Sequence, residues 1–417
     1  MNLSESLLTS VGIVIALWIL DLLYRKYKIR KIIDKIPGPV GHPIFGFSFE
    51  ILKQKREDRD AWFDNLCYEY KEGIVKTWFG TKAVIHIRKP EYLEVIMRST
   101  TQIKKSYLMD FIKPWLGEGI LSSTGQKWFH HRKLITPAFH FNILDEFSEV
   151  MTNHAETLNE QIEKIYNENP EEPIDVFPVI TKCTLDVICE TAMGVKMNIK
   201  YGEGKEYTEA LSEIQNLTME RFFNPWFQWD FIYYQLPIGK KYQSIIDKLH
   251  NFTNEIIAKK IEQRKNKIND RGKDEDNDIG KRKKKALLDL LLDENDKAEN
   301  PMNQSELREQ IDTFTFAGHD TTSATVSWCL FCVGNEPAVQ ENIDKELREV
   351  FGDSKEPVTQ KDVAKLHYLE RVIKETLRRY PTVPNVSRQL VEDIKIGNYL
   401  IPKGCMASLR IAQTHLD

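Results

Sequence analysis

The sequence has little cysteine, and its few cysteines are scattered. Six cysteines occur in 417 residues. This scatter gives no disulfide framework, which is typical of a protein in a reducing compartment. Cys329 and Cys332 form a CxxC motif, but the motif lies inside a predicted helix with no second pair. It therefore does not predict a metal or redox site.

The sequence also lacks a strong excess of charge of either sign. Its formal net charge is −4, from 58 basic and 62 acidic residues. No basic face points to nucleic acid, so we expect no nucleic-acid partner. The apolar content of 41% is enough for a sizeable core.

The N-terminus lacks the marks of a cleaved signal peptide, because no basic n-region and no small-residue cleavage site are visible. Instead Glu5 precedes an apolar run from Leu7 to Leu23, and five basic residues follow it. This order predicts a single membrane anchor at residues 1–24, with the rest of the chain facing the cytosol. Residues 25–43 are predicted to form a basic and Pro-rich linker to one folded domain at 44–417.

The domain is organised around one long predicted helix, from Asn303 to Gly334. Ser305 is the predicted N-cap, and the helix stops before Pro337. About 30 residues give a length of roughly 45 Å, enough to cross a whole domain. Apolar residues on most sides of its two ends predict that it is buried.

The middle of this helix is rich in residues that form helices poorly. Gly318 is costly in a helix interior, and Asp320, Thr321, Thr322 and Thr325 compete for backbone groups. Two interpretations are equally open. The segment is either a Thr-rich kink in a core, or a local opening where an acid and an alcohol relay protons.

The rest of the domain is predicted to be mainly helical with small sheets. A hairpin is expected around Gly80, from residues 75–79 and 83–87, and short strands are expected within 394–409. Helices are expected from Pro90, through most of 144–258, and at 363–379. The charge-rich stretch 259–285 is predicted to be a solvated loop.

Aromatic residues gather between residues 222 and 234. Such a cluster belongs either to a core or, if exposed, to a membrane contact or a substrate entrance. The two interpretations have equal weight from the sequence.

Three further patterns are weak when taken singly. Trp128 and Arg132 share one face of a predicted helix, which suits either an anion clamp or a surface pair. Glu375 and Arg378 are spaced as an ion pair, which is usually surface decoration. Arg388 is a lone cation on a predicted strand.

Taken together and in order, these patterns resemble the cytochrome P450 monooxygenases. The resemblance is carried by WFHHR at 128–132, AGHDTT at 317–322, ETLR at 375–378 and PNVSR at 384–388. The Pro-rich hinge after an anchor is similar to microsomal animal members. FAGHDTT, GNEPAVQ and IPKG are similar to the family-four branch, which includes fatty-acid ω-hydroxylases and many insect enzymes.

The resemblance implies a role for each matching residue. Trp128 and Arg132 would clamp one haem propionate, and Arg388 would meet propionate from the other side. Ala317 and Gly318 would pass close over the haem face. Asp320 and Thr321 would be the acid–alcohol pair that delivers protons to bound oxygen.

The resemblance also implies the structural pair, the chemistry and the partners. Glu375 and Arg378 would form a buried pair in the haem-side core. The activity would be insertion of one oxygen atom of O2 into a C–H bond of a fatty acid, a hormone-like lipid or a xenobiotic. Electrons would come from NADPH through NADPH–cytochrome P450 reductase, with cytochrome b5 as a further partner. The site of action would be the endoplasmic reticulum membrane.

Two departures from the family pattern limit these expectations. Ala317 stands where many family-four enzymes carry the Glu that esterifies the haem, so a non-covalent haem b is expected. The iron-ligand Cys, in a loop of the type FxxGxxxCxG, does not follow Arg378. Cys405 lies in a strand pattern that carries no ligand in the family.

The sequence therefore predicts a mainly α P450 fold with small β-sheets, incomplete at its C-terminus and preceded by a transmembrane helix. No residue of the chain is predicted as a metal ligand, and this chain alone is expected to be inactive. Two alternatives stay open. One is an inactive membrane-bound form that binds lipid or competes for reductase, and the other is a helical membrane scaffold.

Overall fold

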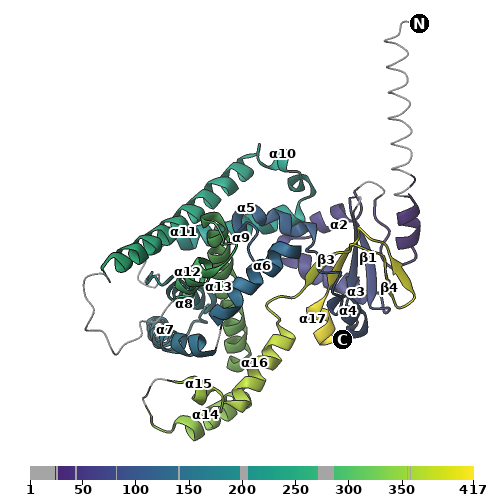
Figure 1. Ribbon diagram of the computed structural model, residues 1–417. Coiled ribbons are helices and arrows are strands. Elements are labelled where there is room, and N and C mark those ends of the chain that lie inside the picture. Colours follow the sequence, from purple (N-terminus) through teal and green to yellow (C-terminus); the bar gives the residue numbers. More distant parts are fainter. Residues whose placement is uncertain are drawn as a thin grey trace, which may run out of the picture. The chain divides into compact units, whose positions relative to one another are not determined.

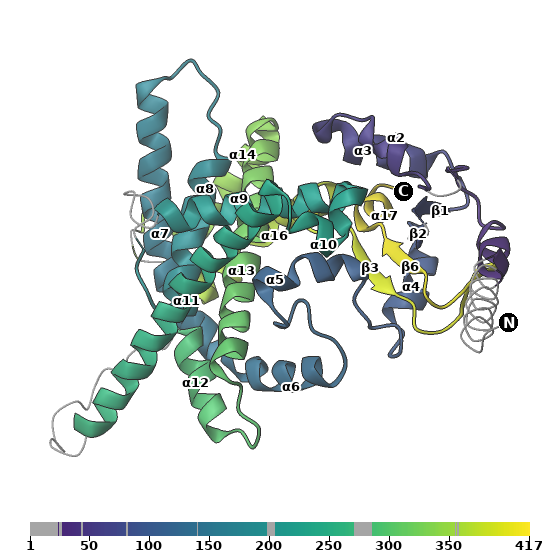
Figure 2. The same ribbon diagram turned by 90° about the horizontal axis from the view of Figure 1, so that it is seen from above.

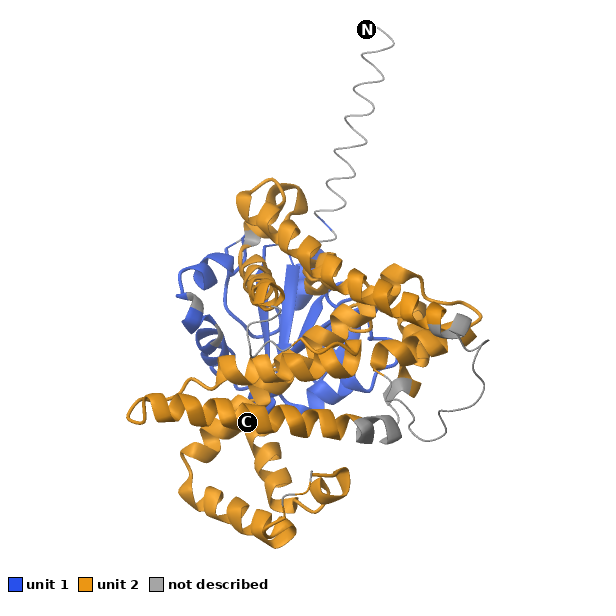
Figure 3. Cartoon of the chain, turned by 90° about the vertical axis from the view of Figure 1, so that its left-hand side faces the viewer, with its two compact units in different colours: residues 1–106, 385–415, 417 blue, residues 107–384, 416 orange. Residues whose placement is uncertain are grey.

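The structure, a computed structural model, describes residues 24, 27–42, 45–80, 82–139, 141–197, 205–270, 286–354, 356 and 358–417. The apolar run predicted as the anchor, Leu7–Leu23, lies outside the described residues. Among the helices within them, none is long and apolar enough to cross a membrane. The chain forms two compact units, residues 1–106, 385–415 and 417, and residues 107–384 and 416 (Figure 3). We call them unit 1 and unit 2.

Unit 1 is built on two small sheets. Its elements are α2 (Ser48–Leu52), η1 (Arg56–Asp58), α3 (Arg59–Tyr68), β1 (Ile74–Phe79), β2 (Lys82–Ile87), α4 (Pro90–Met97), β3 (Val386–Gln389), β4 (Ile394–Ile396), β5 (Tyr399–Ile401), β6 (Met406–Leu409) and α17 (Ile411–Leu416). The larger sheet has the order β1-β2-β6-β3, and β4 pairs with β5. The predicted hairpin and the predicted C-terminal strands are therefore confirmed.

Strands distant in sequence meet in the larger sheet. β2 and β6 are parallel, with Val84 opposite Met406, and β3 is antiparallel to β6, with Arg388 opposite Ala407. Apolar side chains from both parts of the chain form one core, which includes Ile85 and Leu409. The sheet thereby fixes the strand that carries Arg388.

Unit 2 is helical. Its first elements are η2 (Tyr107–Phe111), α5 (Lys113–Leu116), α6 (Gly125–Ile135), η3 (Thr136–Phe139), α7 (Phe141–Glu168), α8 (Phe177–Ile188), the π-helical turn η4 (Cys189–Met193) and α9 (Lys205–Phe223). They are followed by η6 (Pro225–Gln228), α10 (Asp230–Tyr233), α11 (Pro237–Asp270), α12 (Leu287–Lys297), α13 (Gln304–Gly334), α14 (Pro337–Phe351), α15 (Gln360–Val363) and α16 (His367–Arg379). The predicted mainly α class is confirmed.

Helix α13 is the axis of unit 2. α8 and α11 pack along it, and α14 and α16 contact its C-terminal part (Figures 1 and 2). The predicted N-cap was wrong, because Asn303 caps the helix. The Asn303 side chain accepts from the Glu306 N–H, and the Glu306 carboxylate accepts from the Asn303 N–H, both at 3.1 Å. Asn303 is the N-cap because Glu306, three residues later, accepts a hydrogen bond from the Asn303 N–H in return.

Burial of α13 is uneven. Its N-terminal half packs in the main core through Leu307 and Ile311. Its C-terminal half exposes Trp328, Leu330 and Phe331 by 41%, 43% and 56%. The prediction of burial on most sides is therefore wrong for the second half, within the described residues.

The charge-rich stretch differs from its prediction. Residues 259–270 continue α11 and are not a loop. Lys, Glu, Gln and Arg are strong helix formers. Arg264 also pairs with Asp293 and Asp296 of α12 at 2.6 and 2.7 Å. Residues 271–285 lie outside the described residues.

Candidate functional site

The acid–alcohol segment of α13 is helical throughout. No break occurs at Gly318, so the predicted opening is absent from the helix itself. The hydroxyls are bound to carbonyls one turn earlier. Thr321 Oγ1 donates to the Ala317 carbonyl at 2.8 Å, and Thr325 Oγ1 donates to the Thr321 carbonyl at 2.8 Å. Each bond uses the hydroxyl hydrogen. The hydroxyl oxygen can still accept a hydrogen bond from another donor.

Gly318 lies in close contact with a neighbouring helix. A Cβ at this position would lie 2.6 Å from Cδ1 of Ile188 on α8, so any side chain would require Ile188 to move. Thr184 of α8 also donates to the His319 carbonyl at 3.2 Å. α8 therefore holds α13 at close range, and this contact by itself explains a small residue at 318.

Asp320 is held by another helix. Gln215 of α9 donates from Nε2 to Asp320 Oδ1 at 3.0 Å. Both side chains are half-buried, as is Thr321. The sequence did not identify Gln215, since nothing local relates it to Asp320.

Trp128 and Arg132 lie on α6, as predicted. Trp128 is half-buried and contacts Phe129 edge-on, with ring centroids 5.1 Å apart, whereas Arg132 is exposed. An indole N–H and a guanidinium on one helix suit an anion. The role of these two residues stays a prediction.

His131 stands between Trp128 and Arg132 on α6 and contacts α13. The sequence did not identify it as a site residue. His131 is 1% exposed, and its Nδ1 accepts from Gln310 Nε2 at 2.9 Å. Gln310 is fully buried, and its Oε1 accepts from the Ile120 N–H at 2.9 Å. Burial lowers the pKa of His131, so the neutral ring is favoured. This buried pair joins α6 to α13.

Arg388 has a neighbour that the sequence did not reveal. Lys105 forms an isolated bridge with Arg388, and both side chains are half-buried in unit 1. Burial lowers the pKa of Arg388. Burial and then the Arg388 charge lower the pKa of Lys105. Among the described residues neither has an ion-pair partner, so together they suit an anionic ligand.

Glu375 and Arg378 form the predicted pair on α16. Arg378 Nε and Nη2 donate to the two Glu375 oxygens at 2.8 and 2.7 Å. The predicted burial was wrong, because the side chains are 57% and 46% exposed. The pKa of Glu375 is lowered by its bond to Arg378. Thr376 is the buried residue of α16, so the pair lies on the outward side of this helix among the described residues.

Four of the described cysteines, Cys67, Cys189, Cys329 and Cys405, do not fit the role of a thiolate ligand. Burial raises the pKa of Cys405 to about 12 and that of Cys67 to about 11. Burial also raises the pKa of Cys189 and Cys329. A thiol is a ligand only when it loses its proton, so we derive no step through an iron from these residues.

A buried acid on α13 was also missed. Asp312 is 3% exposed, and burial raises its pKa to about 7. Its Oδ1 accepts from the Thr253 hydroxyl at 2.7 Å, and its Oδ2 lies 3.6 Å from Arg308 Nε and 3.8 Å from His250 Nε2. The spacing of Arg308 and Asp312 is the signal that could have found this pair.

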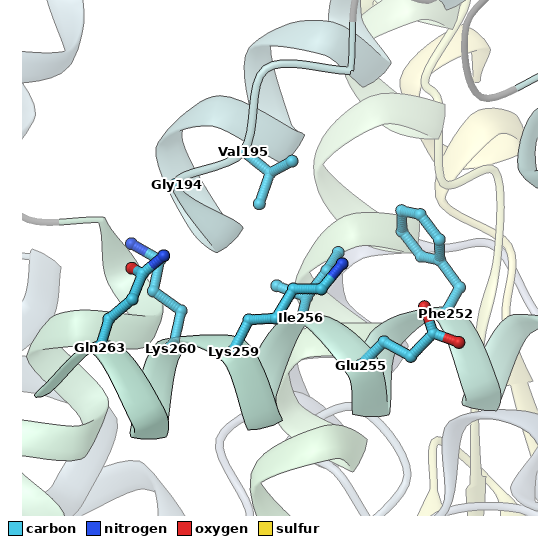
Figure 4. Close-up of a pocket in the computed structure, with 8 residues that line it drawn as sticks. All are labelled: Gly194, Val195, Phe252, Glu255, Ile256, Lys259, Lys260 and Gln263. Atoms are coloured by element: carbon cyan, nitrogen blue, oxygen red, sulfur yellow. The ribbon is translucent and has the colours of Figure 1, made fainter. Parts of the chain in front are cut away.

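One pocket lies elsewhere in unit 2. Its volume is ≈ 210 Å³, below the roughly 300–1,000 Å³ of ligand sites (Figure 4). It is lined by Gly194, Val195, Phe252, Glu255, Ile256, Lys259, Lys260 and Gln263. Lys260 is held by Asp289 at 3.0 Å. None of the predicted site residues lines this pocket.

The structure thus places Asp320 and Thr321 on α13, Trp128 and Arg132 on α6, and an ion-paired ExxR motif on α16. The family model for cytochrome P450 matches residues 36–417. The chain therefore belongs to the cytochrome P450 family, which consists of haem-containing monooxygenases supplied with electrons by a redox partner.

Relatives identify the branch of the family. Cytochrome P450 4V2 of Mus musculus is 40% identical over 380 residues, which are 90% of this chain and 71% of the relative. Cytochrome P450 4V2 of Rattus norvegicus is 41% identical, covering 82% of this chain and 65% of the relative. Cytochrome P450 4c3 of Drosophila melanogaster is 37% identical, covering 94% and 74%. The predicted animal family-four resemblance is confirmed, and the chain spans 65% to 74% of these relatives.

Proposed function

We propose that this protein is a monooxygenase that inserts one atom of O2 into a C–H bond of a lipophilic substrate. The observation that carries the proposal is the acid–alcohol pair, Asp320 and Thr321, half-buried in the middle of α13 in a chain of the P450 family. A non-covalent haem b would supply the activation of O2 when bound. Ala317, in place of an esterifying Glu, supports the non-covalent attachment.

The cationic residues are proposed to bind the haem carboxylates. Trp128 and Arg132 of α6 would donate to one propionate. Arg388 keeps its proposed role as a cation for propionate, and Lys105 beside it is proposed for the same role. Lys105 and Arg388 are half-buried and have no carboxylate partner among the described residues. An anionic ligand would therefore offset the loss of solvation that burial imposes on their charges.

Asp320 and Thr321 are proposed to move protons. The Thr321 hydroxyl already donates to the Ala317 carbonyl, so its oxygen can accept from another donor. Asp320 can pass a proton from solvent, since its side chain is half-exposed. Ala317 and Gly318 would keep this side of α13 free of bulky side chains.

The substrate and partners are proposed from the family-four resemblance. The substrate class is a fatty acid, a hormone-like lipid or a xenobiotic, and the electrons come from NADPH through NADPH–cytochrome P450 reductase, with cytochrome b5 as a further partner. The protein would act at the endoplasmic reticulum membrane, facing the cytosol. The net charge of −4 gives no support to a nucleic-acid partner.

The test is spectroscopic and kinetic, on the protein in its native membranes. A reduced-CO band at about 450 nm, together with NADPH-dependent hydroxylation of a long-chain fatty acid panel, is the expected result. Matched membranes from which the protein has been depleted are the control. Absence of both signals would refute the enzyme and favour an inactive form that binds lipid or reductase.

A further inference from the structure

The carboxylate of Asp320 is tethered to α9 and not to its own helix. Gln215 Nε2 and Asp320 Oδ1 are 3.0 Å apart. An ionised carboxylate only accepts hydrogen bonds, so the amide NH2 must face it. The bond therefore fixes the orientation of the Gln215 amide as well as that of the acid.

The position of Gln215 on α9 is secured by packing. Ile214 is fully buried, and Leu211 and Thr218, one turn to either side, are 3% and 5% exposed. The Thr218 hydroxyl donates to the Ile214 carbonyl at 2.7 Å. α9 therefore presents the amide from a rigid base, whereas the amide itself is half-buried and can exchange its partner.

An amide suits a carboxylate that must stay able to carry protons. A Lys or Arg in this place would hold the charged form and lower its pKa. Gln215 fixes Oδ1 of Asp320 without adding charge. The Thr321 hydroxyl, in contrast, is bound within α13.

We propose that Gln215 is a positioning residue that holds Asp320 in place for proton delivery. This inference rests on the proposed function, since it assigns Asp320 to the proton relay. Its geometric part, the hold on the carboxylate, concerns only residues of this chain.

The first arm of the test measures the carboxylate directly. The purified protein is treated with a carbodiimide and glycine ethyl ester, and coupling at Asp320 is followed by mass spectrometry. Gln215→Leu keeps a side chain of similar bulk, one atom shorter, and removes the donor. Coupling at Asp320 should rise about fivefold, the equivalent of one ordinary hydrogen bond. Gln263→Leu, at an exposed position on α11, is the control and should leave coupling unchanged.

The second arm separates positioning from a structural role. Gln215→Leu and Gln215→Glu should both lower the product formed per NADPH, because neither can hold an ionised Asp320. KM, haem content and melting temperature should stay at parental values, and a merely structural role would move the last two instead. Unchanged coupling at Asp320, or unchanged product per NADPH, would overturn the inference.

The two failures can be told apart. A parent protein that forms no product refutes the proposed function, and the relay role falls with it. A productive parent whose Gln215→Leu variant shows parental carboxyl reactivity refutes Gln215 alone.

Discussion

Thr321 and Asp312 are two polar residues of α13 that differ in burial and in hydrogen bonding. Thr321 is half-buried, with its hydroxyl donated to Ala317, whereas Asp312, more than two turns earlier, is enclosed between α11 and α13. The first is placed to exchange hydrogen-bond partners. The second is a buried acid whose charge is costly.

Replacing Thr321 by Ala should uncouple oxygen use from product. The hydroxyl is proposed to act only when a proton is delivered, so its loss removes a transition-state interaction and leaves haem binding intact. We expect product per NADPH to fall by about tenfold or more. The measurement is product against NADPH consumed, with Thr325→Ala as the matched hydroxyl control one turn later. Parental product per NADPH in Thr321→Ala would show that the relay assignment is wrong.

Asp312 should make stability depend on pH. Its pKa is raised to about 7 in the fold, above the roughly 3.9 of an unfolded chain. The folded state therefore binds more protons between these values, so the free energy of unfolding should fall as pH rises from about 4 to about 7.

The Asp312→Asn variant should remove this fall. Asn cannot ionise, and its side-chain oxygen can still accept from Thr253. It should resemble the parent near or below pH 4 and be more stable than the parent at pH 8, as measured by urea unfolding. Glu341→Gln, exposed on α14, is the control. A parent and an Asn variant with parallel pH profiles would contradict the buried-acid assignment.

At the scale of elements, α13 depends on its cap and on α6. The capping box of Asn303 and Glu306 begins the helix, and Lys127 of α6 approaches Glu306 Oε1 at 3.4 Å. The buried His131–Gln310 pair adds a second link between the same helices. The helix with the acid–alcohol pair is thus fixed to the helix with Trp128 and Arg132.

Asn303→Ala should lower the free energy of unfolding by about 1 kcal/mol, since the cap satisfies a free backbone donor of the first turn. Ser305→Ala should change it by less than about 0.5 kcal/mol, as for an ordinary surface position. Chemical unfolding of both variants and the parent decides between them. A larger fall in the free energy of unfolding for Ser305→Ala than for Asn303→Ala would make Ser305 the N-cap, as the sequence predicted.

The aromatic segment between α9 and α11 divides into a buried and an exposed part. Tyr233 is fully buried and lies over the Arg221 guanidinium at 4.3 Å. Trp226, Trp229 and Phe231 are exposed by 45%, 52% and 74%. The core interpretation therefore holds for Tyr233, whereas a membrane contact or substrate entrance stays a prediction for the exposed trio.

At the scale of the whole molecule, we expect two membrane contacts. Deleting residues 1–24 should weaken retention on microsomes without abolishing it, because the exposed trio is still present. Adding Trp226→Ser, Trp229→Ser and Phe231→Ser should then release the protein. Phe177→Ser, at another exposed aromatic, is the control. Full release by the deletion alone, without detergent or high salt, would exclude the second contact.

Cys405 should not act as a thiolate ligand to a haem iron. Burial keeps Cys405 protonated, with a pKa of about 12, and an iron thiolate needs the deprotonated form. Cys405→Ser should therefore leave the reduced-CO band at about 450 nm unchanged. Loss of this band in Cys405→Ser, in a variant that still binds haem, would make Cys405 the ligand.

The sequence by itself determined the features that depend on neighbours within a few residues. The length of α13, the hairpin around Gly80, the ion pair of Glu375 and Arg378 and the shared helix of Trp128 and Arg132 follow from local periodicity and spacing. These motifs were also sufficient to indicate the family, because their order is informative even where each is weak.

Tertiary structure alone decided which side chains meet across the chain and which become buried. Gln215 and Asp320 are 105 residues apart, and His131 and Gln310 are 179 apart. Lys105 and Arg388 are paired by an isolated β-bridge between distant segments. The exposure of Glu375 and Arg378 and the burial of Asp312 likewise depend on what packs against each helix. A residue's own periodicity specifies its face on an element, but the partner of that face is set by packing between distant segments.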